Sequence, residues 1–181
     1  MLAPAEARRV LETADLVCSA AEVSAAVRRI ATEIRPRLSA ANPLVLAVMG
    51  GAVVFTGQLL PLLDFPLDFD YIHVSRYNED TSGGAIRWKV QPNSRVQGRT
   101  VLVLDDILDQ GETLAEIRKR VMETGAAAFY SAVFAEKDLG REKPIRPDFL
   151  GVTVPNRYVF GFGMDVHGAW RNLPAIYALP A

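Results

Sequence analysis

The segment from Val101 to Leu114, VLVLDDILDQGETL, limits the possible folds of this chain more than any other stretch. Four consecutive apolar residues are typical of a strand that is buried on both faces, and they lead directly into two adjacent aspartates. A tight turn follows at 110–113, and apolar residues then recur at helical spacing. This order predicts a parallel β-sheet with connecting helices and with polar side chains at the carboxyl end of a strand.

The rest of the chain alternates between strands and helices in the same way. A helix is expected over about 20–38, because Ser19 and Glu22 have the spacing of a capping box. The pattern predicts one α/β domain over residues 1–181, with a mainly parallel sheet flanked by helices. The expected strands are 43–51, 67–77, 100–106 and 126–137, with short strands near 149–154 and 157–163, and the polar residues 76–98 form a long excursion.

Composition narrows the class of partners. The net charge of −1 gives no electrostatic argument for nucleic-acid binding, and the chain has no uninterrupted transmembrane run. Cys18 is the single cysteine, so no internal disulfide is possible, which suits a reducing compartment. We therefore expect a cytoplasmic protein that binds neither nucleic acid nor membrane.

The polar residues after the apolar run suit a phosphorylated sugar. Gly111 lets the backbone approach a ligand, Thr113 adds a hydroxyl, and the start of a helix favours phosphate. Asp105 and Asp106 would repel that phosphate, so they should serve sugar hydroxyls or a divalent metal. Helix capping is the structural alternative, but one aspartate would suffice for it and a buried adjacent pair is costly.

The stretch VLVLDDILDQGETL resembles the phosphoribosyl pyrophosphate (PRPP) motif of type I phosphoribosyltransferases, and it is most similar to the hypoxanthine-guanine branch. The similarity extends from about Ala14 to the C-terminus. It implies the type I phosphoribosyltransferase fold with a small base-binding hood, formed by the N-terminal segment and roughly 140–181. It also implies transfer of the 5-phosphoribosyl group from PRPP to hypoxanthine or guanine, which gives IMP or GMP and pyrophosphate.

The resemblance assigns roles within the motif. Asp105 and Asp106 would hold the ribose hydroxyls, directly or through Mg²⁺ and water. Asp109 would lie near the purine N7 as the general acid/base. Gln110 stands where the family often has threonine, and its amide could replace the hydroxyl. The residues implied to bind the 5′-phosphate of PRPP are Asp109, Gln110, Gly111, Glu112 and Thr113.

A second implied site binds pyrophosphate through the backbone amides of Met49, Gly50 and Gly51, together with the side chain of Arg171. Met49 stands where the family usually has a basic residue. We expect a cis peptide bond between Val48 and Met49 that turns the amides toward the ligand. From the residues alone, two glycines after a strand fit an ordinary strand-to-helix turn equally well.

Ser75, Arg76 and Tyr77 resemble the Ser-x-Tyr at the start of the family's catalytic loop. A polar, glycine-bearing excursion beside an active-site edge could form a lid. From the residues alone, a solvated hairpin is the simpler interpretation.

The last third of the chain is implied to select the base. Lys137 would hydrogen-bond the purine 6-oxo group, Tyr158 would stack on the ring, and Val159 would contact the base through its backbone. Asp165 would bind a second Mg²⁺. Without the resemblance, Lys137 would be interpreted as a surface lysine and Tyr158 as a core or edge-strand residue. The two histidines, His73 and His167, are expected to be structural or exposed.

Two other functions remain open from the sequence. One is a transferase that prefers xanthine, because the sequence does not reveal the preference among hypoxanthine, guanine and xanthine. The other is a regulator on the same fold that binds nucleotide and RNA, which an assay of PRPP-dependent turnover would distinguish. The family's habit implies a homodimer or homotetramer.

Overall fold

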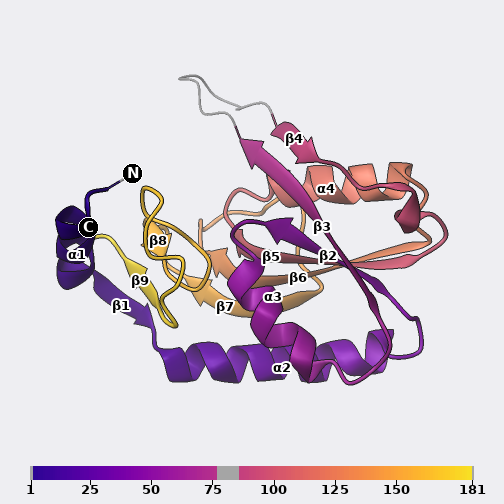
Figure 1. Cartoon of the computed structure of the whole chain (residues 1–181), viewed down its shortest axis with the longest axis horizontal. Coiled ribbons are helices and arrows are strands. Elements are labelled where there is room, and N and C mark those ends of the chain that lie inside the picture. Colours follow the sequence, from indigo (N-terminus) through magenta and orange to yellow (C-terminus); the bar gives the residue numbers. More distant parts are fainter. Residues whose placement is uncertain (1, 77–85, 181) are drawn as a thin grey trace.

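The fold is built around a six-stranded sheet in the order β4-β3-β2-β5-β6-β7 (Figure 1). The computed structural model describes residues 2–76 and 86–180. All neighbouring strands are parallel except β3 and β4, which are antiparallel. The mainly parallel sheet predicted from the sequence is confirmed. Its strands are β2 (Leu44–Met49), β3 (Asp68–Arg76), β4 (Ile86–Val90), β5 (Thr100–Leu108), β6 (Ala128–Lys137) and β7 (Phe149–Val154).

Helices cover both faces of this sheet. On one face lie α2 (Ala20–Leu38) and α3 (Val53–Leu59), which continues into the short η1 (Leu60–Leu62). On the other lie α4 (Glu112–Glu123) and the short η2 (Ser94–Val96). The apolar run of β5 serves both faces, because Leu102 and Leu104 join one core cluster whereas Val101 and Val103 join the other.

The helix predicted over 20–38 is confirmed as α2, and its start has the expected capping box. The amide of Glu22 donates to Ser19 Oγ at 3.3 Å, and the amide of Ser19 donates to Glu22 Oε2 at 2.7 Å. These reciprocal bonds satisfy two backbone donors at the helix start. The helix thereby begins directly after β1.

The two ends of the chain form a second, antiparallel sheet in the order β1-β9-β8 (Figure 1). Its strands are β1 (Asp15–Cys18), β8 (Val159–Phe160) and β9 (Ile176–Ala178), and α1 (Pro4–Thr13) precedes β1. Trp170 Nε1 donates to the Ala7 carbonyl at 2.7 Å and so fastens α1 to the C-terminal segment. The expected hood range of 140–181 includes β7, which belongs to the main sheet, so only the later part of that range lies in the small sheet.

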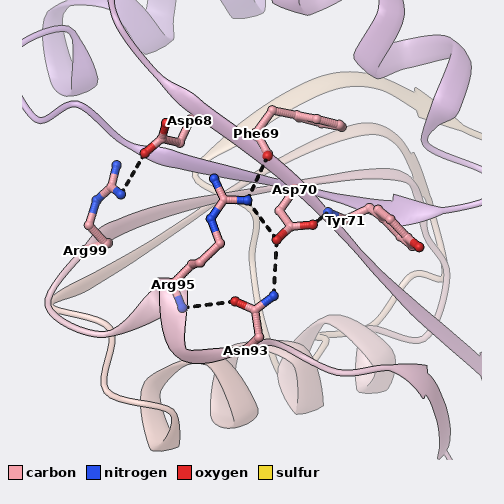
Figure 2. A network of polar contacts seen from close by, with 7 residues as sticks. All are labelled: Asp68, Phe69, Asp70, Tyr71, Asn93, Arg95 and Arg99. Carbon is pink, nitrogen blue, oxygen red and sulfur yellow. Dashed lines mark hydrogen bonds and ion pairs between the residues drawn. The ribbon is translucent and has the colours of Figure 1, made fainter.

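The polar excursion over 76–98 contains a strand, β4, that the sequence interpretation did not name. Its antiparallel pairing with β3 supports the hairpin alternative at the base of the excursion. Beyond β4, Figure 2 shows Arg95 donating to Asp70 Oδ2 at 3.1 Å and Asn93 Nδ2 donating to the same oxygen at 3.2 Å. A separate ion pair joins Arg99 to Asp68 at 2.8 Å, so the return from the excursion is held against β3. Among the described helices, none is long and apolar enough to cross a membrane.

Candidate active site

A cleft of about 540 Å³ opens at the carboxyl edge of the main sheet. The ends of β2, β3 and β5, the start of α4 and a segment of the C-terminal third contribute to its walls. The structure thus brings together residues that are widely separated in the sequence, as expected for this edge of a parallel sheet. The predicted site residues that line it are Met49, Gly50, Gly51, Ser75, Asp105, Asp106, Asp109, Gln110, Gly111, Thr113, Asp165 and Arg171.

A smaller cavity of about 190 Å³ adjoins the cleft and shares Asp106, Ile107, Asp109, Asp165 and Arg171 with it. The predicted base-binding residues Lys137, Tyr158 and Val159 complete its lining, together with Met164. The predicted site therefore has two connected compartments. Glu112 does not line either cavity, although it begins α4 directly beside the turn.

The acidic pair lies inside β5, before the strand ends. Asp105 is only 7% exposed. Burial, and then the neighbouring charge of Asp106, raise the pKa of Asp105 well above its usual value. Burial also raises the pKa of Asp106, although hydrogen bonds and the Arg171 charge partly oppose this shift. The capping alternative is wrong, because the residue that precedes the first turn of α4 is Gly111. Adjacent carboxylates with raised pKa values, one buried and one partly buried, are typical of functional sites.

The turn from Asp109 to Gly111 connects the acidic strand to α4. Gly111 has a φ of +86°, a backbone conformation that residues other than glycine rarely adopt. A Cβ added to Gly111 would lie 3.1 Å from Pro144 Cδ. Gln110 Oε1 accepts a hydrogen bond from Arg141 Nη2, a partner that the sequence did not indicate. The positive end of the α4 dipole faces this turn, which favours an anion there.

The cis peptide bond is between Met49 and Gly50, so the expected position between Val48 and Met49 was wrong by one residue. The reason is that β2 continues through Met49, which pairs with His73 of β3, and the backbone departs from extended geometry only after this last pair. Gly51 lies tightly against the acidic pair, since an added Cβ would lie 1.8 Å from Asp106 Oδ2. The segment that follows β2 is therefore in direct contact with Asp106 of β5 at the cleft.

Lys137 and Asp109 form an ion pair of 3.0 Å between Nζ and Oδ2. They meet because β5 and β6 are parallel neighbours, with Leu108 opposite Glu136 at the end of the ladder. The Lys137 side chain is 16% exposed, so the interpretation as a surface lysine is wrong. The residue predicted to read the purine and the residue predicted to move a proton are thus in direct contact.

Tyr158 is 48% exposed beside the smaller cavity, so it is not a core residue. Its hydroxyl donates to the Asp165 carbonyl at 3.2 Å. Its ring is stacked with His167, at 6.3 Å between centroids and 16° between planes. His167 therefore packs against the predicted base platform.

Arg171 and Asp165 hold each other at the boundary between the two cavities. Arg171 Nη2 lies 2.5 Å from Asp165 Oδ1, and Nη1 donates to the Gly163 carbonyl at 2.6 Å. The second carboxylate oxygen of Asp165 accepts from the Gly168 amide at 2.7 Å. Across the described part of the chain, no three His, Cys, Asp or Glu side chains gather to form a metal site by themselves.

Three comparisons with known proteins agree with this geometry. A family profile described as the phosphoribosyl transferase domain matches residues 19–167. This chain belongs to that family. The hypoxanthine-guanine-xanthine phosphoribosyltransferase of Tritrichomonas foetus is 34% identical over 156 residues, which cover 86% of this chain and 85% of the relative. The hypoxanthine-guanine phosphoribosyltransferase of Lactococcus lactis is 37% identical over 139 residues, which cover 76% and 75%.

The solved structure of Trypanosoma cruzi hypoxanthine phosphoribosyl transferase superposes with a TM-score of 0.83 at 26% identity, covering 92% of this chain and 91% of that one. Family membership and the type I phosphoribosyltransferase fold, both expected from the motif, are confirmed.

The catalytic-loop assignment and the expectation for His73 had other outcomes. Ser75 lines the cleft and Arg76 ends β3, but Tyr77 lies outside the described residues, so the lid assignment stays a prediction. His73, which was expected to be structural or exposed, also lines the cleft. The two-residue alternation of β3 places it on the same face as Ser75, and this signal could have identified it. Burial, and then the charge of Lys89, lower the pKa of His73.

Proposed function

We propose that this phosphoribosyltransferase transfers the 5-phosphoribosyl group from PRPP to hypoxanthine or guanine, giving IMP or GMP and pyrophosphate. The observation that carries the proposal is the Lys137–Asp109 ion pair at the junction of the two cavities. In this assignment the larger cleft takes PRPP and the smaller cavity takes the purine. The names of the relatives also favour this activity over a regulatory role on the same fold.

The larger cleft offers separate groups to the three parts of PRPP. The carboxylates of Asp105 and Asp106 would accept hydrogen bonds from the two ribose hydroxyls. The turn at 109–113 would bind the 5′-phosphate with its backbone amides. The amides of Gly50 and Gly51, with Arg171, would bind pyrophosphate and stabilise the charge that develops on it.

Magnesium fits the donor set of this cleft, because Mg²⁺ prefers carboxylate oxygens and keeps several waters. Asp105 and Asp106 would hold one ion together with PRPP, and Asp165 would contribute to a second. The raised pKa values of the acidic pair support a positive ligand there, since a cation makes their ionisation less costly. Bound magnesium would neutralise the negative charge of pyrophosphate.

Base recognition and proton transfer would both begin when Lys137 and Asp109 exchange each other for the purine. When a 6-oxopurine enters, the Lys137 ammonium would leave Asp109 and donate to the purine 6-oxo group. Asp109 would then face N7 and exchange a proton there as the general acid/base. Adenine presents an amino group instead, which would leave the largely buried lysine donors unpaired, so it should be rejected.

The stacking and closure roles complete the proposal. Tyr158 would stack on the purine, and the backbone of Val159 would contact its edge. The segment that begins at Ser75 would close over the bound substrates and exclude water from the activated sugar. We also propose a homodimer or homotetramer. We further propose a cytoplasmic location, which the single cysteine, the free and buried Cys18, supports.

An assay of product stoichiometry tests the proposal. The purified protein is incubated with PRPP, hypoxanthine and Mg²⁺, and IMP and pyrophosphate are quantified together. Equal amounts of both products are expected, and their formation should require PRPP. Tight PRPP binding without either product would overturn the enzymatic assignment and favour a nucleotide-binding regulator.

A further inference from the structure

Lys143 lies in the loop between β6 and β7, and its ammonium is buried at the end of the main sheet. The side chain is only 5% exposed. Nζ donates to the Leu108 carbonyl at 3.1 Å, to the Lys137 carbonyl at 2.6 Å and to Glu136 Oε1 at 3.1 Å. An ammonium has three donors, and all three are used here. Because the ammonium is buried and all three donors are hydrogen-bonded, its position is strongly restricted.

The two carbonyls belong to Lys137 and to the residue that precedes Asp109. Leu108 is the last residue of β5 and directly precedes Asp109, whereas Lys137 is the last residue of β6. The β5–β6 register ends with the pair Leu108 and Glu136. The Lys143 ammonium therefore connects the two strands just beyond their regular pairing, where the backbone ladder no longer fixes their separation.

The backbone beside Lys143 also contacts the phosphate turn. A Cβ added to Gly111 would lie 3.3 Å from Lys143 Cβ and 3.1 Å from Pro144 Cδ, so the loop lies directly against that glycine. One short segment thus touches the turn, the residue before Asp109 and the residue predicted to read the purine.

We propose that Lys143 is a positioning residue that sets the separation between Asp109 and Lys137. This inference rests on the proposed function, in which Asp109 must reach N7 while Lys137 reaches the 6-oxo group of the same purine. Both groups therefore need a fixed spacing across the two strand ends. Misplacement by about 1 Å can reduce a rate about 100-fold. Lys143 acts through these two residues and does not itself touch either substrate.

The test uses Lys143→Met, which keeps most of the length of the side chain and removes the donors. It also uses the double variant Lys143→Met/Glu136→Gln, in which no Glu136 carboxylate is left without its partner. Lys119→Met is the matched control, because this lysine of α4 has a side chain that is 66% exposed and pairs with Glu123 only at 4.0 Å. Steady-state kinetics, PRPP affinity, GMP affinity and the folded fraction at the assay temperature are measured for each protein.

We expect kcat/KM for hypoxanthine to fall about 10- to 100-fold in both Lys143 variants, and GMP affinity to fall with it. PRPP affinity per folded molecule should stay within about threefold, and Lys119→Met should behave like the wild type. Unchanged hypoxanthine kinetics in the folded double variant would overturn the inference. The inference would also be overturned if hypoxanthine kcat/KM fell only in proportion to the folded fraction and PRPP affinity fell by the same factor. If the wild type itself has no turnover, the proposed function fails, and this inference fails with it. If the wild type turns over and the Lys143 variants behave like it, only this inference fails.

Discussion

The sugar-phosphate end and the base end of the site are built in different ways. At the sugar-phosphate end, one uninterrupted segment supplies the acidic pair, the turn and the start of α4. At the base end, Lys137 comes from β6, whereas Tyr158 and Val159 come from β8 and the residue before it. In the small sheet, β8 pairs with β9, which in turn pairs with β1. The sugar-phosphate end of the site depends on local chain geometry. The base end of the site depends on how the N-terminal and C-terminal segments pack.

The two ends also differ in burial. Asp105 is almost fully buried with a raised pKa, whereas Tyr158 is half exposed. The carboxylates of the sugar-phosphate end therefore lower the stability of the fold, because they are costly to ionise without a ligand. The base end leaves an open aromatic face whose contacts are completed only by a ligand. Substitutions at the two ends should accordingly change different quantities.

The largest expected effect is at Asp109, where the two ends meet. Asp109→Asn should lower kcat by about two to four orders of magnitude, because asparagine cannot exchange a proton at N7. PRPP affinity should change far less, since the turn backbone is kept. Stopped assays at saturating substrates, together with a direct PRPP binding measurement, provide the check. Turnover near the wild-type rate would remove Asp109 from the acid/base role.

The next effect should be confined to the base end. Lys137→Gln should lower the ratio of kcat/KM for hypoxanthine to that for adenine by about 100-fold, or abolish purine binding, because the charged donor to the 6-oxo group is lost. PRPP affinity should remain close to that of the wild type. Steady-state kinetics with both purines measure the ratio. If the ratio is unchanged, Lys137 does not read the base.

A smaller effect is expected at the aromatic platform. Tyr158→Ala should raise KM for hypoxanthine about tenfold, since stacking of a base on an aromatic ring is worth about 1–3 kcal/mol. Tyr158→Phe is the matched control and should stay within about twofold, because the ring is kept. Equal KM values for the alanine and phenylalanine variants would show that the ring does not stack on the purine.

The smallest effect concerns stability at the sugar-phosphate end. In the presence of a chelator, Asp105→Asn should raise the free energy of unfolding by about 0.5–2 kcal/mol, the range of single stabilising substitutions. Thermal or urea unfolding of both proteins measures the difference. A variant less stable than the wild type at neutral pH would contradict the assignment of a costly carboxylate.

The pH dependence of that difference has a definite sign. The folded-state pKa of Asp105 is raised above its unfolded value, so the wild type loses stability as pH rises from the unfolded pKa to the folded one. The advantage of Asp105→Asn should therefore vanish at acidic pH, grow through this window and be constant above it. An advantage that grows toward acidic pH would have the wrong sign.

The same contrast explains what the sequence could predict. The acidic pair and the turn were identified because apolar residues, carboxylates and a glycine occur consecutively in one strand–turn–helix segment. The helix over 20–38 followed from its capping pair, Ser19 and Glu22. Local rules of this kind require no knowledge of distant residues.

Other features depended on contacts that the sequence does not encode locally. The cis bond follows Met49 because β2 remains paired with β3 up to that residue. The partners of Lys143 include two backbone carbonyls, which have no sequence signature. The strand β4 was different, because Ile86, Trp88 and Val90 alternate with two charged residues and so carried a usable signal within a polar stretch.

The most direct test of the central claim is a steady-state comparison of hypoxanthine, guanine, xanthine and adenine as acceptors with saturating PRPP and Mg²⁺. Transfer from the sugar-phosphate end to a 6-oxopurine at the base end predicts that kcat/KM for hypoxanthine or guanine exceeds that for adenine by at least about 100-fold. It also predicts one pyrophosphate for each nucleotide formed. Adenine as the best acceptor, or no transfer to any of the four, would contradict it.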